Sequence, residues 1–280
     1  STLMNHLLGE KVAIVSSKPQ TTRNRIAGIL TKGDDQYVFI DTPGVHHAKN
    51  KLGEFMMKSV RSSVGAADAI ILIAEAGYPA GETEKNLIAQ IKKTALPSIL
   101  VLNKIDLVNR EKLAETIAGY AALHNFDAVV PTCAETGKNV EEVLEEASNF
   151  LYEGEWMFDE DSLTDQPERQ IAAEIIREKM LRTLSDEIPH GTAVVIEEFT
   201  EEENLIRIRA EIFCEKQSHK GIIVGKKGEM LKKIGTYARE DMEAFFGQNV
   251  YLNLWVKVKE KWRDDMLSLN NFGFKPEDVR

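Results

Sequence analysis

The first 150 residues alternate short apolar runs with amphipathic segments, and this alternation restricts the fold more than any other feature. Five runs have lengths typical of buried strands: KVAIV from Lys11, YVFI before Asp41, AIILIA from Ala69, SILVL from Ser98 and AVVP from Ala128. Segments with helical periodicity, such as EKNLIAQIKK and EKLAETIAGYAALH, separate several of these runs. Continuous apolar strands that alternate with helices predict an α/β domain with a mainly parallel sheet covered on both faces.

The apolar runs are too short for a membrane span, and the cysteines form no recognisable framework. AIILIA falls far short of the roughly 18 apolar residues that indicate a transmembrane helix, so we expect no integral membrane segment. Cys133 and Cys214 lie far apart and outside any metal-ligand spacing, which argues against a disulfide framework or a zinc site. This cysteine content predicts a reducing, cytoplasmic location.

The charges are unevenly distributed, and their distribution predicts the domain boundaries. We predict a first domain over residues 1–152 and a second over 169–280, because residues 153–168 form an acidic linker with seven acids and no Lys or Arg. The formal net charge of −10 argues by itself against a nucleic acid partner. The segment Lys216 to Arg263, however, has eleven basic residues against five acidic ones. A basic surface is therefore expected only in the second domain.

Polar motifs directly follow three of the predicted strands. DTPG (Asp41–Gly44) follows YVFI, NKID (Asn103–Asp106) follows SILVL, and TCAETGKN (132–139) follows AVVP. Ligands of doubly covered parallel sheets bind at the carboxyl ends of the strands. Taken alone, DTPG fits a Pro-Gly turn and NKID an Asx-type turn. Their occurrence in this order, each at the end of a predicted strand, favours a ligand site at one edge of the sheet.

The NKID motif has the chemistry of a guanine site. The carboxylate of Asp106 can accept both guanine donors, N1–H and the 2-amino group, whereas adenine has a bare acceptor at N1 and no 2-amino group. A buried polar group left unpaired costs about 1–3 kcal/mol, which is enough for strong base selection. We expect Asn103 to brace the purine edge and the stem of Lys104 to lie over the ring.

The DTPG motif suits the phosphate end of a nucleotide. Asp41, a carboxylate at the end of a strand, can hold Mg²⁺ through water, because Mg²⁺ keeps part of its hydration shell. Gly44 has no Cβ, so its backbone N–H can approach a terminal phosphate closely.

The order DTPG, NKID, TCAETG resembles that of the translation-factor-related GTPases. The resemblance implies that Ser1-Thr2 ends a phosphate-binding loop, G-x-x-x-x-G-K-[ST], that a Gly-Lys pair precedes Ser1, and that the Ser1 hydroxyl coordinates Mg²⁺. The stretch KPQTTRNRIAG (Lys18–Gly28) resembles the first switch segment of the Era and TrmE-like branch, in which Thr21 or Thr22 senses the γ-phosphate through Mg²⁺. Without the resemblance, this stretch fits a polar loop whose hydroxyls cap a helix.

The resemblance assigns residues to the nucleotide and to the metal. The residues implied for GTP or GDP are Ser1, Thr2, Asp41, Thr42, Pro43, Gly44, Val45, Asn103, Lys104, Asp106, Cys133, Ala134 and Glu135. Those implied for Mg²⁺ are Ser1, Thr22 and, through water, Asp41.

The second switch departs from the pattern of Ras-like GTPases. In those proteins a glutamine that positions the attacking water follows the glycine, whereas this chain has Val45 and then His46 and His47. A valine cannot orient water by hydrogen bonding. We therefore predict slow intrinsic hydrolysis and leave the catalytic residue open, with Thr21, Thr22, Val45 and His46 as the switch candidates.

The C-terminal part has a different pattern. A helical segment, RQIAAEIIREKMLRTL, precedes two strand-like runs, TAVVIEEF and NLIRIRAEIFCE. Two helical segments then flank Gly225-Lys226-Lys227-Gly228, and the period-two run VYLNLWVKVKEKW follows. The order predicts an α+β domain and resembles a KH domain of the bacterial, type II arrangement with GKKG as its G-x-x-G loop. The alternative is a helical hairpin with a solvated, lysine-rich turn.

The KH resemblance implies single-stranded RNA as the ligand. Glycines let the backbone approach a sugar-phosphate chain, and lysines and the N-terminus of the next helix supply positive potential. The implied RNA-binding residues are Ile222, Ile223, Gly225, Lys226, Lys227, Gly228 and Lys232.

A GTPase domain followed by one KH domain resembles the Era-type GTPases of bacterial ribosome assembly. The resemblance implies a switch that binds small-subunit ribosomal RNA near its 3′ end, assists assembly of the small ribosomal subunit, and has a weak peripheral contact with the inner face of the membrane. We expect a monomer. Two alternatives stay open: an RNA-binding chaperone with an inactive nucleotide site, and a GTPase acting in RNA modification.

Overall fold

The computed structural model describes residues 1–16, 18, 20–45, 48–185 and 188–275. The chain divides into two compact units, each made of several segments. Unit 1 comprises Ser1–Ala13, Ala27–Asp41 and Arg61–Thr164, and unit 2 comprises Ile14–Ile26, Thr42–Val60 and Asp165–Arg280. Residues 14–26 and 42–60 therefore pack with the C-terminal part of the chain. The domains predicted from sequence, 1–152 and 169–280, were continuous stretches and did not include this exchange. In the described part of the chain, every helix is too short or too polar to span a bilayer.

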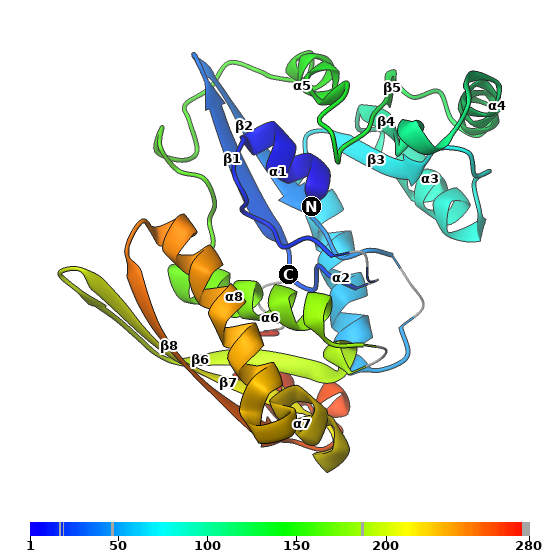
Figure 1. Ribbon diagram of the computed structural model, residues 1–280. Coiled ribbons are helices and arrows are strands. Elements are labelled where there is room, and N and C mark those ends of the chain that lie inside the picture. The colour runs from blue at the N-terminus through cyan, green and yellow to red at the C-terminus, as the bar shows by residue number, and fades with distance from the viewer. Residues whose placement is uncertain (17, 19, 46–47, 186–187, 276–280) are drawn as a thin grey trace. The chain divides into compact units, whose positions relative to one another are not determined.

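Unit 1 contains the predicted parallel sheet. Strands β3 (Ile70–Glu75), β4 (Ser98–Asn103) and β5 (Ala128–Pro131) lie in the order β3-β4-β5, with both pairs parallel (Figure 1). The central strand β4 has no exposed surface from Ile99 to Leu102. This burial on both faces is what the continuous apolar run SILVL predicts.

Helices cover both faces of this sheet. Leu100 and Leu102 of β4 share an apolar core with α3 and α4, whereas the alternate residues Ile99 and Val101 share a second core with α1 and α5. Because successive side chains of a strand point to opposite faces, the two cores lie on opposite sides, and the predicted α/β architecture is confirmed. The helices are α1 (Thr2–Leu8), α3 (Glu82–Thr94), α4 (Arg110–Ala121) and α5 (Val140–Ser148).

Two further strands form a separate hairpin. β1 (Ile26–Lys32) and β2 (Asp35–Asp41) pair in a two-stranded sheet. Only Gly33 and Asp34 join them, so the strands run antiparallel, and Gly33 has a left-handed φ of +64°. β2 contains the predicted run YVFI, whereas the sequence pattern did not predict β1.

The run KVAIV is largely buried but forms no strand, so that prediction is wrong. Its backbone bonds to a side chain instead. The Asn5 side-chain oxygen accepts the N–H groups of Val12 (3.1 Å) and Ala13 (2.9 Å), and its amide donates to the Ala13 carbonyl (2.7 Å). These three bonds replace a strand ladder and satisfy the buried backbone.

The acidic segment 153–168 lies along the hairpin for most of its length. The Trp156 indole donates to the carbonyl of Asp34 (2.9 Å), and Ile29 N–H donates to the carbonyl of Leu163 (2.9 Å). The Gln36 side chain bonds the backbone of Phe158 in both directions, at 2.9 and 3.0 Å. The composition of a linker therefore does not prevent this segment from docking.

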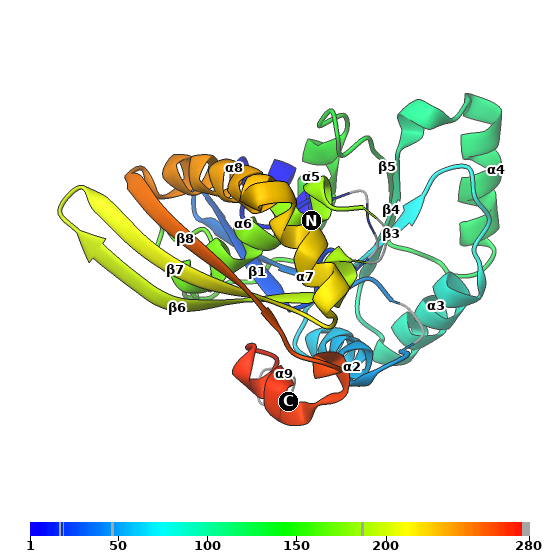
Figure 2. The same ribbon diagram turned by 60° about the horizontal axis from the view of Figure 1, so that its bottom comes forward.

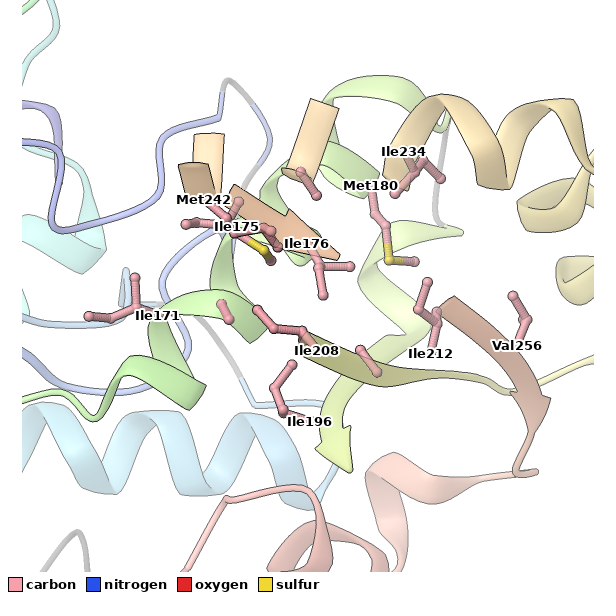
Figure 3. Packing of buried hydrophobic residues seen from close by; sticks show 14 of the residues in the cluster. Ile171, Ile175, Ile176, Met180, Ile196, Ile208, Ile212, Ile234, Met242 and Val256 are labelled. Carbon is pink, nitrogen blue, oxygen red and sulfur yellow. The ribbon is translucent and has the colours of Figure 1, made fainter. Parts of the chain in front are cut away.

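Unit 2 has the predicted helix and strand order. Its elements are α6 (Glu168–Thr183), β6 (Thr192–Glu202), β7 (Leu205–Cys214), α7 (Gln217–Val224), α8 (Glu229–Phe246) and β8 (Asn249–Val258). Strand β7 is antiparallel to β6 and parallel to β8, and α6, α7 and α8 lie on one face of the sheet (Figures 1 and 2). Alternate residues of β7, such as Ile208 and Ile212, meet Ile176 and Met180 of α6 in the core (Figure 3).

The C-terminal tail closes a second core in unit 2. Trp262 has no exposed surface, and its indole donates to the carbonyl of Gly191 at 3.0 Å. Leu269 of α9 (Met266–Asn271) and Phe274 pack around it, together with residues of α2 (Lys51–Gly65). Residues 262–274 therefore form part of the folded unit.

Replacing Asn5 by alanine tests the side chain that substitutes for a strand. We expect Asn5→Ala to lower the protection of the Ala13 amide by roughly fivefold or more, because unpaired buried backbone groups cost about 1–3 kcal/mol. The Val12 amide should lose less protection, because it also contacts the Glu10 carbonyl at 3.2 Å. Hydrogen exchange followed by NMR measures this directly. Asn86→Ala, on an exposed position of α3, is the control and should leave these amides unchanged; equal exchange in both variants would contradict the role of Asn5.

Candidate functional site

The carboxyl ends of β4 and β5 are joined by Asn103. Its side-chain oxygen accepts the backbone N–H of Ala134 (2.8 Å) and the hydroxyl of Thr132 (3.3 Å). A backbone bond from Ile105 N–H to the Thr132 carbonyl (3.1 Å) adds a second link. The structure therefore brings NKID and TCAETG together, as predicted.

Asp106 lies in a short 3₁₀ turn, Ile105–Leu107, and its side chain is exposed. Among the described residues, no hydrogen bond or ion pair uses this carboxylate. Lys104 precedes the turn with a left-handed φ of 65°, and its ammonium lies 2.8 Å from Glu75 at the end of β3. The ends of three strands thus meet here, with one carboxylate presented to a ligand.

The loop after β5 is compact and contains several residues with small side chains. Cys133 N–H donates to the carbonyl of Lys138 (3.0 Å), and Thr136 N–H donates to the carbonyl of Cys133 (3.2 Å). Cys133 and Ala134 are buried, whereas Glu135 is exposed. This loop can therefore approach a planar base closely through its backbone.

The proposed metal ligands Ser1 and Asp41 lie together. The Ser1 hydroxyl donates to Asp41 Oδ2 at 2.5 Å. Ser1 caps α1, and Asp41 ends β2. A hydroxyl and a carboxylate are oxygen ligands of the kind that Mg²⁺ prefers, so this pair fits the ion. Within the described residues, no group of three or more His, Cys, Asp or Glu forms a separate metal site.

Helix α1 connects this metal end with the base end. Leu3 of α1 packs in the same core as Val101 of β4 and Ala134. The ring of His6 lies against Gly137, where an added Cβ would be only 3.2 Å from it. Both halves of the candidate nucleotide site therefore belong to unit 1.

The first switch segment, residues 14–26, belongs to unit 2 and contacts α6. Arg177, only 3% exposed, donates to the carbonyl of Thr21 and forms an ion pair with Glu174 at 2.6 Å. The Thr21 hydroxyl donates to the carbonyl of Lys18 at 2.7 Å, and Thr22 is buried. In this conformation the KH-containing unit holds the two threonines predicted to sense the γ-phosphate.

Arg23 anchors the same segment more deeply. Its guanidinium, 2% exposed, donates to the carbonyls of Thr192 (2.6 Å) and His190 (2.8 Å). Burial, and next the positive charge of Arg177, lower the pKa of Arg23 well below its usual value, to about 9. The side chain still carries its charge at neutral pH.

The boundary between the two units falls inside the second switch, directly after Asp41. Thr42, Pro43, Gly44 and Val45 follow Asp41 but belong to unit 2, with Pro43 buried and Gly44 exposed. His46 lies outside the described residues. The structure therefore brings Ser1 and Asp41 together, and the metal and nucleotide roles of Ser1, Asp41, Thr22 and Thr42–Val45 stay predictions.

The GKKG loop links α7 to α8 in unit 2. Gly225 has φ +73°, and an added Cβ would lie 2.6 Å from Met230 Cβ and 2.9 Å from its backbone nitrogen. Lys227 (φ 52°) and Gly228 (φ 81°) are also left-handed. Lys226 and Lys227 are both exposed. This geometry requires glycine at the first position and presents two ammonium groups beside the start of α8.

The structure corrects one predicted RNA contact. Ile223 has no exposed surface and packs in the core of unit 2, whereas Ile222 is 48% exposed. Adjacent residues of a helix point about 100° apart, so both cannot face a ligand. Ile222 and the exposed Lys232 fit the predicted interface, and Ile223 supports it from within.

Sequence reasoning missed the charged residues that hold the switch segment. Arg23, Arg177 and Glu178 are almost wholly buried, although their residue types are typical of exposed helix faces. The only available signal was indirect: helix 168–183 has apolar residues but also many charges on every face. Contacts across more than 150 residues have no local pattern.

Comparison with known proteins finds the same two domains. A family model described as 50S ribosome-binding GTPase matches residues 1–104, and one described as KH domain matches residues 187–263. GTPase Era of Ruminiclostridium cellulolyticum is 46% identical over 98% of this chain and 93% of its own length. GTPase Era of Caldanaerobacter subterraneus is 48% identical, with the same coverage of both chains.

Solved structures show the same similarity. A crystal structure of Era in complex with MgGDPNP and nucleotides 1506–1542 of 16S ribosomal RNA is 37% identical, with a TM-score of 0.94 over 98% of this chain and 94% of that one. A variant of Aquifex aeolicus Era bound to GDP·AlF4⁻ has the same identity, TM-score and coverage. Fold and sites together define a P-loop GTPase domain followed by a KH domain. The chain belongs to the Era family of GTPases.

Asp106→Asn tests the guanine site. The amide presents a donor to one of the two guanine donors, so we expect GTP affinity to fall by roughly fivefold to 150-fold, the equivalent of about 1–3 kcal/mol. Xanthine nucleotides, which carry an oxygen at position 2, should bind better to the variant than to the wild type. Fluorescence titration measures both. Asp68→Asn, at an exposed carboxylate, is the control; unchanged GTP affinity in Asp106→Asn would refute the assignment.

Charge reversal at Lys226 and Lys227 tests the KH loop. The double variant to glutamate should lose RNA binding and keep GTP binding, because phosphate contacts dominate nucleic acid affinity. RNA titration at several salt concentrations measures the effect. Reversal of the adjacent exposed pair Lys92 and Lys93 on α3 is the matched control, and equal RNA affinity in both double variants would exclude the loop.

Proposed function

We propose that this protein is a GTP-hydrolysing switch that binds the 3′ region of small-subunit ribosomal RNA and assists assembly of the small ribosomal subunit. The observation that carries the proposal is the presence in one chain of a strand edge that presents the Asp106 carboxylate beside the loop after β5 and of a strained GKKG loop with two exposed lysines. The solved Era complex with 16S ribosomal RNA supports the choice of RNA.

Magnesium is the ion proposed for the phosphate end. The Ser1 hydroxyl would bind it directly, and Asp41 would hold it through water, consistent with their contact. Thr22 would also bind the Mg²⁺ ion in the GTP state. The ion would neutralise developing charge on the phosphates.

The switch would operate through residues 14–26 and 42–45. In the GTP state these segments would order around the γ-phosphate, and hydrolysis would release them. Because both segments pack in unit 2 here, their release changes the surroundings of the KH domain. This is the route by which nucleotide state would control RNA binding.

The proposal extends to the location of the protein in the cell and to its oligomeric state. We propose a monomer in the cytoplasm with a weak contact at the inner face of the membrane. The basic segment Lys216 to Arg263 is the part suited to anionic lipid.

GTP hydrolysis measured with and without RNA tests the function. We expect slow hydrolysis by the protein alone, since Val45 stands where Ras-like proteins have a water-positioning glutamine. An RNA with nucleotides 1506–1542 of 16S ribosomal RNA, or small ribosomal subunits, should change the hydrolysis rate. Alternatively, the affinity for this RNA should differ between the GTP and GDP states. A protein that binds no guanine nucleotide in the presence of Mg²⁺ would exclude the switch.

A further inference from the structure

Helix α6 carries two adjacent charged side chains that are almost wholly buried and bond to different parts of unit 2. Glu178 has no exposed surface, and Lys179 is 6% exposed. Glu178 Oε1 accepts the backbone N–H of Val15, in the first switch segment, at 3.0 Å. Lys179 forms an ion pair with Asp241 of α8 and lies 3.3 Å from Glu178 Oε2. The two residues thus connect the switch segment with α8.

Arg182 completes the hold on the switch segment. One of its amino groups donates to Glu178 Oε1 and to the carbonyl of Val15, both at 3.0 Å. Both backbone polar groups of Val15 are therefore bonded to side chains of α6. The Arg177 bond to the carbonyl of Thr21 adds a contact six residues further along.

The α8 side of the connection leads to the RNA loop. Asp241 lies on the continuous helix α8, which begins at Glu229 directly after GKKG. A cavity of about 400 Å³ opens between α6 and α8 beside the ion pair, lined by Lys179, Arg182, Thr183, Lys233, Tyr237, Glu240 and Asp241. Polar and charged groups therefore line the gap between the helices here, next to the apolar core in which Met180 meets Ala238 and Met242.

We infer that Glu178 and Lys179 act together as positioning residues that couple the first switch segment to helix α8, so that the position of residues 14–26 sets the RNA affinity of the GKKG loop. The inference rests on the proposed function. Buried charges tolerate the loss of a partner poorly, so a shift of Val15 away from Glu178 changes the partners that Lys179 and Asp241 require. RNA bound at the loop acts back on the segment, because coupling between two sites is reciprocal.

RNA affinity in two nucleotide states tests the coupling. The full-length protein is loaded with GDP or with a non-hydrolysable GTP analogue and titrated with the RNA 1506–1542. We expect the ratio of the two dissociation constants to differ from one by about fivefold or more in the wild type and to approach one in Lys179→Met and in Asp241→Asn. The double variant should behave like either single variant, since the pair acts as a unit.

Two further variants separate charge from shape. Lys179→Arg keeps the charge and should keep most of the ratio. Lys112→Met removes an exposed lysine paired with Glu115 at 2.9 Å on α4 and should change nothing. An unchanged ratio in Lys179→Met and Asp241→Asn, with a nucleotide-dependent wild type, overturns the coupling and leaves the proposed function intact. A wild type whose RNA affinity ignores the nucleotide overturns both the coupling and the switch.

Hydrogen exchange gives a readout that a purely structural role would not change. In the wild type, added RNA should alter the protection of the Val15 amide. In Asp241→Asn, whose side chain is partly exposed in the native protein and which is therefore expected to fold, RNA should bind and leave Val15 unaffected. An identical response of Val15 to RNA in both proteins would overturn the inference, even if Lys179→Met does not fold.

Discussion

The side-chain oxygen of Asn103 holds two strand ends at one sheet edge, and the candidate guanine site depends on this bond. It accepts from Ala134 N–H and Thr132 Oγ1 and so fixes the loop after β5 against the end of β4. The Asp106 carboxylate is then presented beside a backbone that these bonds hold in place. Base selection by a carboxylate requires such fixed surroundings, because a loose acceptor could turn to water and avoid the unpaired state.

The backbone N–H and C=O groups find their hydrogen-bond partners differently in the two units. In the sheet of unit 1, neighbouring strands supply the partners, so the site residues stand at strand ends. In the segment 14–26, the described residues before Ile26 belong to no strand. Charged side chains supply hydrogen-bond partners there: Glu178 and Arg182 for Val15, and Arg177 for Thr21. A segment held by side chains is released when the helix that carries those side chains moves. A strand is released only when its backbone hydrogen bonds to the neighbouring strand break.

The sequence predicted those parts of the structure that local pattern determines. β4, the turn after β5 and the GKKG loop follow from apolar runs and glycines, whose effects act within a few residues. KVAIV was wrongly predicted because Asn5, outside the run, supplies the hydrogen bonds that a strand partner would have given. Ile223 was misplaced because one residue along a helix changes the face. The docking of the acidic segment on β1 and β2 required contacts with Asp34 and Gln36 that composition cannot reveal.

The buried charges of α6 make this helix more than a support for the sheet. A buried Glu178 without partners would be strongly destabilising, whereas apolar residues of similar size would pack there without any such demand. The observed arrangement therefore contributes specificity: Glu178 accepts the Val15 amide and pairs with Lys179 and Arg182 at their present positions. Packed networks of this kind tend to change between discrete arrangements rather than gradually. Such behaviour is what a switch needs, because a γ-phosphate acts on only a few atoms and must still change the state of a helix.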